Sequence, residues 1–388
     1  MRILLCNYEY PPLGGGGGVA SADIAEELVK THHVTVLTSQ GKGLARREVV
    51  NGVDVVRVPV IGRNARSTAS LASMLSYVPL AIQEGSRLVR DESFDVVNTH
   101  FAIPTGPAGD RIARRAGIPN VLTVHGGDLY DPSKFLSPHR HAVLRTTVRR
   151  QLQRADAVVA QSRNTEQNVR RYYTPDLSVE LIPLGIKPVP PEEASRAVFG
   201  IPADAVVMVT IGRLVARKGV DTLIEVVRRA STPNLHLIVI GEGPLSGKLA
   251  AQAAEAGISS NVHFTGSVSE ADKYGLLHAS DFYVSASLHE GFGLVFLEAM
   301  ACGLPVVCFD EGGQTDFLAD GATGRLVEVG NVDALEAVCR DLAADRESRV
   351  LLGKNALARV QPYFIHQCAA RYEALFQRVI ATKRRVIR

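Results

Sequence analysis

Short apolar runs alternate with longer amphipathic stretches along the whole chain. In the first half, β-branched and other apolar residues form runs at residues 2–7, 33–39, 94–99, 120–124 and 157–161. Apolar side chains recur at helical spacing between them, at residues 19–30, 105–116 and 135–154. Apolar strands that alternate with helices are typical of βαβ units, in which helices cover both faces of a parallel sheet. Asn51-Gly52 separates two more runs, 48–50 and 53–58, and predicts a small hairpin.

A proline-rich segment interrupts this alternation near residue 188. Residues 182–191 contain four prolines and a glycine, which favours a linker because proline fixes its own φ and disfavours helix before it. Strands are expected again at residues 205–211, 235–240, 262–264, 282–285 and 305–309, and later helices at about 333–343 and 346–359. After Pro362 come a last helix at 365–379 and a basic tail at 383–388. We expect an α/β protein with doubly wound domains at 1–187 and 188–364, which hold ligand in a cleft between them.

Composition narrows the class of protein. At 388 residues, with 46% hydrophobic and 21% charged residues, the chain is an ordinary globular protein of two domains. Its net charge of +3 gives no indication of nucleic-acid binding. Five cysteines without CxxC spacing suit a reduced, cytoplasmic protein better than a disulfide framework or a zinc site. The first residues do not form a signal peptide, and no long apolar window predicts a membrane span.

The most informative segment is HEGFGLVFLEAMACG, residues 289–303. Gly291-Phe292-Gly293 opens a helix that Gly303 closes, and glycines at a helix start let an anion approach the free N–H groups. Glu298 is the only charged residue in this helix. A carboxylate among apolar neighbours needs a partner, and helical side chains lean toward the N-terminus. We therefore expect Glu298 to reach the same ligand; the alternative is a carboxylate on the solvated face.

A second segment, residues 206–218, ends an apolar strand in a cationic loop. Arg213 and Lys218 follow the strand, and two cations at that position suit a diphosphate. The alternative is a solvated charged loop. Residues 237–244, LIVIGEGP, repeat the arrangement, with Gly241 and Gly243 at the next strand end.

In the first half, the strand at 2–7 leads to a glycine run, Gly14 to Gly18. The pattern Gly15-x-Gly17-x-x-Ala20 fits a dinucleotide fingerprint loosely, but about six residues separate strand and glycines, and the second strand ends without a ribose-binding carboxylate. A flexible loop that covers a phosphate or sugar fits better.

Two histidines follow strands in this half, His125 in HGGD and His100. We expect His125 to face the cleft, and His100 more weakly; a capping or core histidine is the alternative. No spacing of ligands indicates a metal. The helix at 135–154 carries a set of arginines that indicates a solvated face or contact with a membrane surface or an anionic acceptor: Arg140, Arg145, Arg149, Arg150 and Arg154.

Together these motifs resemble the retaining family 4 glycosyltransferases of the GT-B fold. Glu290 and Glu298 match the E-x7-E motif of that family within HEGFGLVFLEAMACGLPVV. GRLVARKG, IGEGP and FTGSV resemble its other C-terminal motifs, and YPPLGGGGG and TVHGGD its N-terminal ones. The resemblance covers nearly the whole chain.

The resemblance implies a role for each matched position. Arg213 and Lys218, with Gly212 and Gly241 beside them, would bind the donor pyrophosphate, and Glu298 would bind the ribose. The other matched residues would hold the donor sugar (Glu290 and the backbone of Gly291, Phe292 and Gly293), the phosphate (the Leu294 amide), the base (Val268) and the reaction centre (His125). The glycine loop, Gly16 and Gly17 included, would cover the phosphates or face the acceptor. The helix at 365–388 would cross back to the N-terminal domain.

The chemistry expected of such a site is departure of a diphosphate from an oxocarbenium-like sugar, which positive charge and helix N–H groups assist. No second carboxylate is evident as a nucleophile, so front-face attack by the acceptor hydroxyl is the working hypothesis. The resemblance implies no metal and no cofactor beyond the donor substrate. UDP-hexoses and GDP-mannose are both donors in the family, and a glycan, a lipid-linked sugar or a polyol would be the acceptor. The enzyme would be cytoplasmic, in the soluble phase or peripheral on the inner membrane surface.

Three other interpretations share parts of this pattern. A sugar-nucleotide epimerase such as a UDP-sugar 2-epimerase has the architecture but lacks the E-x7-E context. A non-catalytic sugar-nucleotide-binding relative would have lost Arg213, Lys218 or Glu298, which are all present. An NAD-dependent dehydrogenase is disfavoured by the missing ribose carboxylate.

Overall fold

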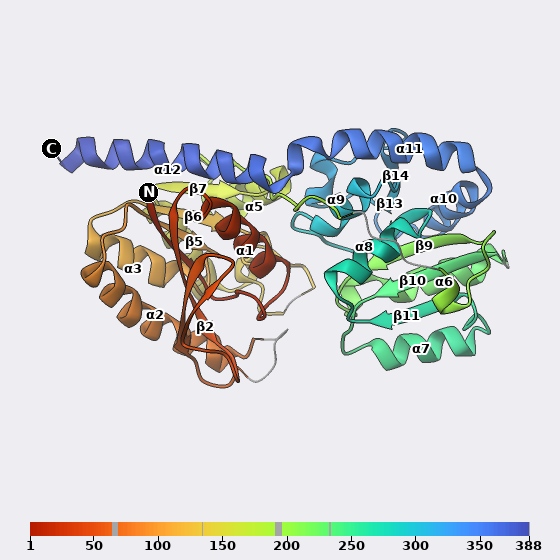
Figure 1. Ribbon diagram of the computed structural model, residues 1–388, viewed down its shortest axis with the longest axis horizontal. Helices are drawn as coiled ribbons and strands as arrows, with labels where there is room; N and C mark the ends of the chain where they lie inside the picture. Colours follow the sequence, from red (N-terminus) through yellow and green to blue (C-terminus); the bar gives the residue numbers. More distant parts are fainter. Residues whose placement is uncertain (64–68, 134, 191–195, 233, 388) are drawn as a thin grey trace. The chain divides into compact units, whose positions relative to one another are not determined.

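The computed structural model describes every residue except 64–68, 134, 191–195, 233 and 388. The chain divides into two compact units (Figure 1). Unit 1 contains Met1–Lys187 and Tyr363–Arg388, and unit 2 contains Pro188–Pro362. Residue 191 of the expected linker and residue 388 of the expected tail lie outside the described residues.

Unit 1 is built on an eight-stranded sheet of order β3-β4-β2-β1-β5-β6-β7-β8. Only the β3–β4 hairpin is antiparallel among its neighbouring pairs. This confirms the hairpin predicted around Asn51-Gly52. The strands are β1 (Arg2–Asn7), β2 (His33–Gln40), β3 (Arg47–Val50), β4 (Val53–Pro59), β5 (Val96–His100), β6 (Asn120–Val124), β7 (Ala157–Ala160) and β8 (Glu180–Leu181).

Helices cover this sheet in two groups. Helix α2 packs on α3 and α3 on α4, whereas α1 packs on α12, whose Tyr372 is fully buried and hydrogen-bonds Thr123 of β6 at 3.1 Å. The buried aliphatic positions of the alternating strands and helices form the core, as expected from their pattern. The helices are α1 (Gly16–Leu28), α2 (Leu71–Asp91), α3 (Gly106–Ala116), α4 (Ala142–Arg154), α5 (Arg163–Tyr172) and α12 (Ile365–Ile387).

Unit 2 has a six-stranded parallel sheet of order β11-β10-β9-β12-β13-β14. Its core is the apolar cluster between this sheet and helices α6, α7 and α10. The strands are β9 (Val206–Ile211), β10 (Leu235–Ile240), β11 (Val262–Gly266), β12 (Phe282–Ser285), β13 (Val306–Phe309) and β14 (Gly324–Val327). The helices are α6 (Val220–Ala230), α7 (Ser246–Glu255), α8 (Glu270–His278), α9 (Leu294–Ala301), α10 (Val332–Ala344) and α11 (Arg346–Arg359).

Several elements differ from the sequence-based expectations, among them α5, β8 and β14, which were not predicted. Helix α4 begins at Ala142 rather than at 135, because a 3₁₀ turn at Pro138–Arg140 precedes it. Helix α12 continues through the expected basic tail to Ile387. Helix α2 was not predicted, because its buried stripe contains residues such as Ser73, Ala81 and Gly85 and so lacks a strong apolar signal. None of the described helices is long and apolar enough to cross a lipid bilayer.

Candidate active site

The predicted site residues of unit 2 gather where the strand order reverses. Strands β9 and β12 are neighbours, but the chain continues from β9 to β10 and from β12 to β13, on opposite sides. Loops at the carboxyl ends of two such strands diverge, which leaves a crevice where open α/β sheets bind ligands. Arg213 and Lys218 follow β9, and Glu290 follows β12. This topology therefore places the predicted residues at the edge of the sheet where open α/β proteins usually bind ligands.

Lys218 and Glu290 form an ion pair across these two loops. Their side chains are only 15% and 11% exposed, so water screens the pair weakly. Burial acts to raise the pKa of Glu290, but the charge and hydrogen bond of Lys218, with Arg217 and Ser287, hold that pKa below its ordinary value. Glu290 is thus an ionised carboxylate at neutral pH.

Glycines let the two loops meet. Gly219 has φ +61°, and a Cβ there would lie 2.2 Å from the Ala286 carbonyl oxygen of the β12 loop. Gly241 has φ +129°, and a Cβ would lie 2.2 Å from the Gly212 carbonyl oxygen. The strand ends of β9, β10 and β12 are therefore in contact through backbone. Arg213 is exposed beside Gly212 in the same loop.

Helix α9 begins directly after Glu290. Gly293, at φ +91°, is its N-cap, and Leu294 is its first residue. The Phe292 side chain is buried, with its ring 5.3 Å from that of Phe317, so this residue can offer a ligand little beyond its backbone. Gly291 is partly exposed. The first turn of α9 thus directs free N–H groups toward the neighbourhood of Lys218 and Glu290, which favours an anion.

Glu298 of α9 has the charged partner that its apolar surroundings require. Lys273 of α8 lies 2.9 Å from Glu298 Oε1 and 2.8 Å from Glu270 Oε2, and is itself 8% exposed. Burial lowers the pKa of Lys273, but the two carboxylates more than offset this and raise it. Val268 lies half-buried in the loop before α8. Lys273 was not predicted from the sequence, because it follows Glu270 and Asp272 in the first turn of α8 and so resembles an ordinary solvated charge.

The glycine run of unit 1 is not the flexible loop that was predicted. Gly16, Gly17 and Gly18 form the first turn of α1, with Gly15 as the N-cap. A Cβ on Gly17 would lie 2.4 Å from the Phe101 ring, so a side chain there would displace the loop after β5. Gly16 has open space around it. The run therefore gives a helix N-terminus with accessible backbone, because the glycines lack side chains that would cover it.

His125 and His100 lie in contact at the carboxyl ends of β6 and β5. His100 Nδ1 is 2.9 Å from His125 Nε2, and His100 Nε2 is 2.8 Å from Asn98 Oδ1. Burial lowers the pKa of His125 to about 4, and burial together with His125 lowers the pKa of His100 well below its usual value. Both rings are therefore neutral at pH 7.

The partners of this chain fix which nitrogen carries each proton. Asn98 donates Nδ2 to the Val121 carbonyl at 3.2 Å, which leaves Oδ1 to accept from His100 Nε2. Neutral His100 then accepts at Nδ1 from His125 Nε2. His125 Nδ1 makes no hydrogen bond of ordinary geometry among the described residues, and the Gln161 side chain acts to raise the pKa of the ring against the effect of burial.

Two further residues hold His125 in place. Asp128 accepts from the His125 backbone N–H at 2.9 Å and from that of Ala102 at 2.7 Å, which joins the loops after β6 and β5. Gln161 donates Nε2 to the His125 carbonyl at 2.7 Å, and its Oε1 is also buried without a partner in the described structure. Asp128, Gln161 and Asn98 were not assigned a role from the sequence. Only the HGGD motif gave a signal, for Asp128.

Comparison with known proteins identifies the class. The profile "Glycosyl transferase 4-like domain" matches residues 15–185, and "Glycosyl transferases group 1" matches residues 191–359. The chain belongs to the glycosyltransferases that combine these two domains, and its fold is GT-B, with two Rossmann-like domains.

Particular relatives extend over nearly the whole chain. A GDP-mannose-dependent alpha-(1-6)-phosphatidylinositol monomannoside mannosyltransferase of Mycolicibacterium smegmatis is 30% identical over 371 residues, 90% of this chain and 91% of that protein. Sucrose-phosphate synthase from Thermosynechococcus elongatus superposes with a TM-score of 0.86 at 22% identity, over 98% of this chain and 100% of that one. Anabaena HepE in complex with UDP-glucose gives a TM-score of 0.73 at 21% identity, over 96% and 99%.

Proposed function

We propose that this glycosyltransferase moves a hexosyl group from a UDP-hexose or GDP-mannose to an acceptor hydroxyl, with retention of anomeric configuration. The observation that carries the proposal is the weakly exposed Lys218–Glu290 pair at the switch point of unit 2. It sets a cation for phosphate beside a carboxylate for sugar hydroxyls. The E-x7-E resemblance of Glu290 and Glu298 agrees with this division.

The leaving diphosphate is bound by cations and backbone amides. Lys218 has three ammonium hydrogens, so it can bond Glu290 and a phosphate oxygen together. Arg213 follows the same strand, and the Leu294 amide begins α9. These groups stabilise charge where it develops as the sugar–phosphate bond breaks. Removal of one such donor typically lowers the rate by about 10²–10³-fold.

The nucleoside is bound next to this position. Glu298 is oriented by its ion pair with Lys273, and its carboxylate can accept hydrogen bonds from the paired hydroxyls of a ribose. Val268 offers a half-buried surface to the base. The Gly212 and Gly241 backbones, in contact with each other, leave room for the nucleotide at the sheet edge.

Each unit, taken by itself, carries polar groups that suit the hydroxyls of a sugar. Glu290, with the backbone of Gly291, Phe292 and Gly293, accepts and donates hydrogen bonds to its hydroxyls. In unit 1, the buried His125 ring and Gln161 side chain, which interact with each other, offer polar atoms to sugar hydroxyls. The N-terminal amides of α1, Gly16 and Gly17 among them, face phosphate or acceptor.

Retention follows from attack on the face that the diphosphate leaves. The C1–O bond to phosphate breaks with its electrons on the diphosphate, the acceptor oxygen bonds to C1 on the same face, and the acceptor proton passes to the departing phosphate oxygen. Glu290 is paired with Lys218 and remains ionised. The ion pair lowers its reactivity as a nucleophile, and an ionised carboxylate has no proton to give as a general acid. The proposed step uses the donor, the acceptor hydroxyl and the charged groups of the protein.

The acceptor is a glycan, a lipid-linked sugar or a polyol. A relative with 30% identity is named for transfer to a phosphatidylinositol mannoside, which supports a hydroxyl-rich acceptor. We also propose that the enzyme works in the cytoplasm, because all five of its cysteines are free and four of them are buried.

The test uses nucleotide binding and transfer in matched variants. UDP and GDP should raise the melting temperature of the wild type, one more than the other, and the preferred UDP- or GDP-sugar should be slowly hydrolysed. Lys218→Ala should weaken binding of the nucleoside diphosphate about tenfold or more, since it removes a charge-assisted contact. Lys248→Ala, at an exposed position of α7, is the control. Unchanged nucleotide affinity in Lys218→Ala would overturn the phosphate assignment.

Product analysis then tests the reaction itself. NMR of the product should show the anomeric configuration of the donor. An inverted product would exclude front-face transfer. Conversion of the nucleotide sugar to an epimer without any acceptor would indicate an epimerase instead.

A further inference from the structure

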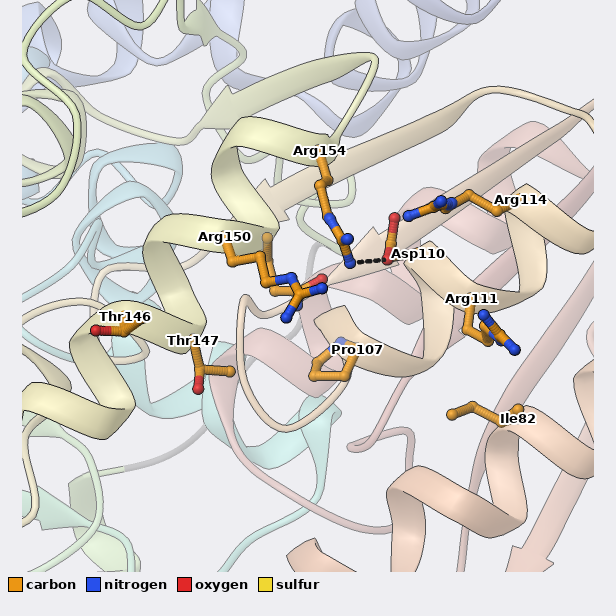
Figure 2. Close-up of a pocket in the computed structure, with 10 residues that line it drawn as sticks. Ile82, Pro107, Asp110, Arg111, Arg114, Thr146, Thr147, Arg150 and Arg154 are labelled. Carbon is orange, nitrogen blue, oxygen red and sulfur yellow. Dashed lines mark hydrogen bonds and ion pairs between the residues drawn. The ribbon is translucent and has the colours of Figure 1, made fainter.

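A basic groove lies on unit 1, between α3 and α4 (Figure 2). It encloses about 500 Å³, and Ile82 of α2 closes one side. Arg111 and Arg114 enter from α3, and Arg150 and Arg154 from α4. None of these residues belongs to the sites proposed for the donor, so the groove is a separate feature.

Close packing of the two helices forms its floor. A Cβ on Gly106, the first residue of α3, would lie 2.9 Å from Gln151 Cγ of α4. One turn later, Asp110 pairs with Arg154 at 3.3 Å. These two contacts fix α3 and α4 against each other, so the arginines project from a rigid base.

The charges within the groove are unbalanced. Asp110 is the only carboxylate among the lining residues, is 7% exposed, and is already bound to Arg154. Arg114 also extends toward Asp110 (Figure 2). Arg111 and Arg150, exposed on the two helices, have no carboxylate partner within the lining. Four guanidinium groups around one carboxylate repel each other unless an anion joins them.

Polar groups beside the arginines add acceptors and donors. Thr146 and Thr147 line the α4 side of the groove, and the Thr147 hydroxyl donates to the Val143 carbonyl at 2.9 Å, which leaves its oxygen able to accept. Gln151 is 6% exposed, and its Oε1 is buried without a partner in the described residues. A buried acceptor in a basic groove suits a ligand that carries both negative charge and a hydroxyl hydrogen.

We propose that this groove binds the phosphate group of a hydroxyl-bearing phosphate ester. Guanidinium groups match phosphate in planar, paired hydrogen bonds, with Arg111 and Arg150 as the main contacts. The hydroxyl of the ester lies against Gln151. This site is independent of the nucleotide-sugar site.

The surroundings of the groove favour a lipid headgroup as the source of the phosphate. Val143 lies on the groove face of α4, one turn before Thr147, and is 77% exposed. Phe135, 81% exposed, packs on His141 at the N-cap of α4. Exposed apolar side chains next to arginines are typical of surfaces that rest on a membrane interface. A free phosphate ester has the same chemistry without this apolar contact.

The experiment measures binding of the full-length enzyme to two probes without any transfer reaction. One probe is phosphatidylcholine vesicles with or without phosphatidylglycerol, whose headgroup carries both a phosphate ester and free hydroxyls, assayed by co-sedimentation. The other is glycerol 3-phosphate, assayed by calorimetry. The double variant Arg111→Gln/Arg150→Gln should lower the affinity for whichever probe binds by about tenfold or more, because each arginine near a phosphate surface contributes strongly to binding.

The matched control is Arg145→Gln/Arg149→Gln, which removes the same charge from exposed positions of α4 outside the groove. If Arg111→Gln/Arg150→Gln loses vesicle binding and the control keeps it, the phosphate belongs to a lipid. If Arg111→Gln/Arg150→Gln loses glycerol 3-phosphate binding and the control keeps it, the ligand is a free ester. The proposal would be overturned if both double variants lost probe binding equally, or if the wild type bound neither probe. Retained stabilisation by UDP or GDP would show that the nucleotide site is intact in each variant.

Discussion

The carboxyl ends of the two sheets present very different side chains to a ligand. In unit 2 the edge is built from charges, Lys218 with Glu290 and Lys273 with Glu298. In unit 1 it is built from neutral rings, His100 and His125, whose pKa values burial depresses. Asp128 in unit 1 is used to tie backbone N–H groups together.

This difference indicates a division of labour. Ion pairs that are weakly screened suit the diphosphate, whose charge rises during reaction. Neutral acceptors with fixed protons suit sugar hydroxyls, which they can distinguish without attracting phosphate. The same Rossmann-like topology therefore serves two kinds of recognition, because only the residues after the strands differ.

Glu290→Gln tests the charged edge most severely. The amide keeps the size of the side chain but removes the charge that holds Lys218. We expect transfer to fall about a hundredfold or more, while affinity for UDP or GDP stays the same or rises, since Lys218 is then free for phosphate. Initial rates and calorimetry measure the two effects.

The control is Glu255→Gln, an exposed carboxylate on α7. Loss of nucleotide affinity as large as the loss of rate would mean that Glu290 only positions Lys218. In that case Glu290 and Lys218 would not bind the sugar and the phosphate as separate contacts within unit 2.

Much of the charged edge could be predicted from sequence, because its residues sit in short motifs next to strands. The strands at 120–124, 235–240 and 282–285 have the predicted bounds, since apolar runs between polar loops give a strong signal. Once the strands are predicted, Lys218 and Glu290 fall in loops that follow two of them, at the carboxyl edge of the sheet. Their ion pair itself depends on Gly219, whose close approach to Ala286 only the fold reveals.

The neutral edge was harder to predict. Asn98 and His100 lie on β5 and Gln161 follows β7, and the contacts of His100 and Gln161 with His125 after β6 follow from sheet order rather than from spacing in sequence. The glycine run was misjudged for a related reason. Glycine disfavours helix, yet Gly16 to Gly18 are helical. The Phe101 ring leaves no room for a side chain at Gly17, which explains the glycine at that position.

Acid stability tests the neutral edge. The pKa of His125 is about 4 when folded and about 6.5 when unfolded. The unfolded chain therefore binds a proton first as pH falls, and stability is lost between these two values. We expect His125 alone to lower the free energy of unfolding by about 2 kcal/mol from pH 7 to pH 5. Urea unfolding at the two pH values measures it.

The variant His125→Asn should flatten this dependence, whereas His366→Asn, at an exposed position of α12, should leave it unchanged. A slope that is the same in all three proteins would mean that His125 gains its proton in the fold as readily as in the unfolded chain. Unit 1 would then present a cation, and the contrast between the units would disappear.

Glu298→Gln should give the smallest effect and the sharpest distinction within unit 2. Lys273 keeps Glu270 as a partner at 2.8 Å, so the fold should tolerate the change. If Glu298 binds the ribose, the wild type should bind the preferred nucleoside diphosphate about tenfold more tightly than its 2′,3′-dideoxy analogue, and the variant should bind both alike. A variant that weakens both nucleotides equally would instead place Glu298 behind Lys273, as a support for α8. Titration of the two nucleotides against both proteins separates these outcomes, because only a direct contact depends on the ribose hydroxyls.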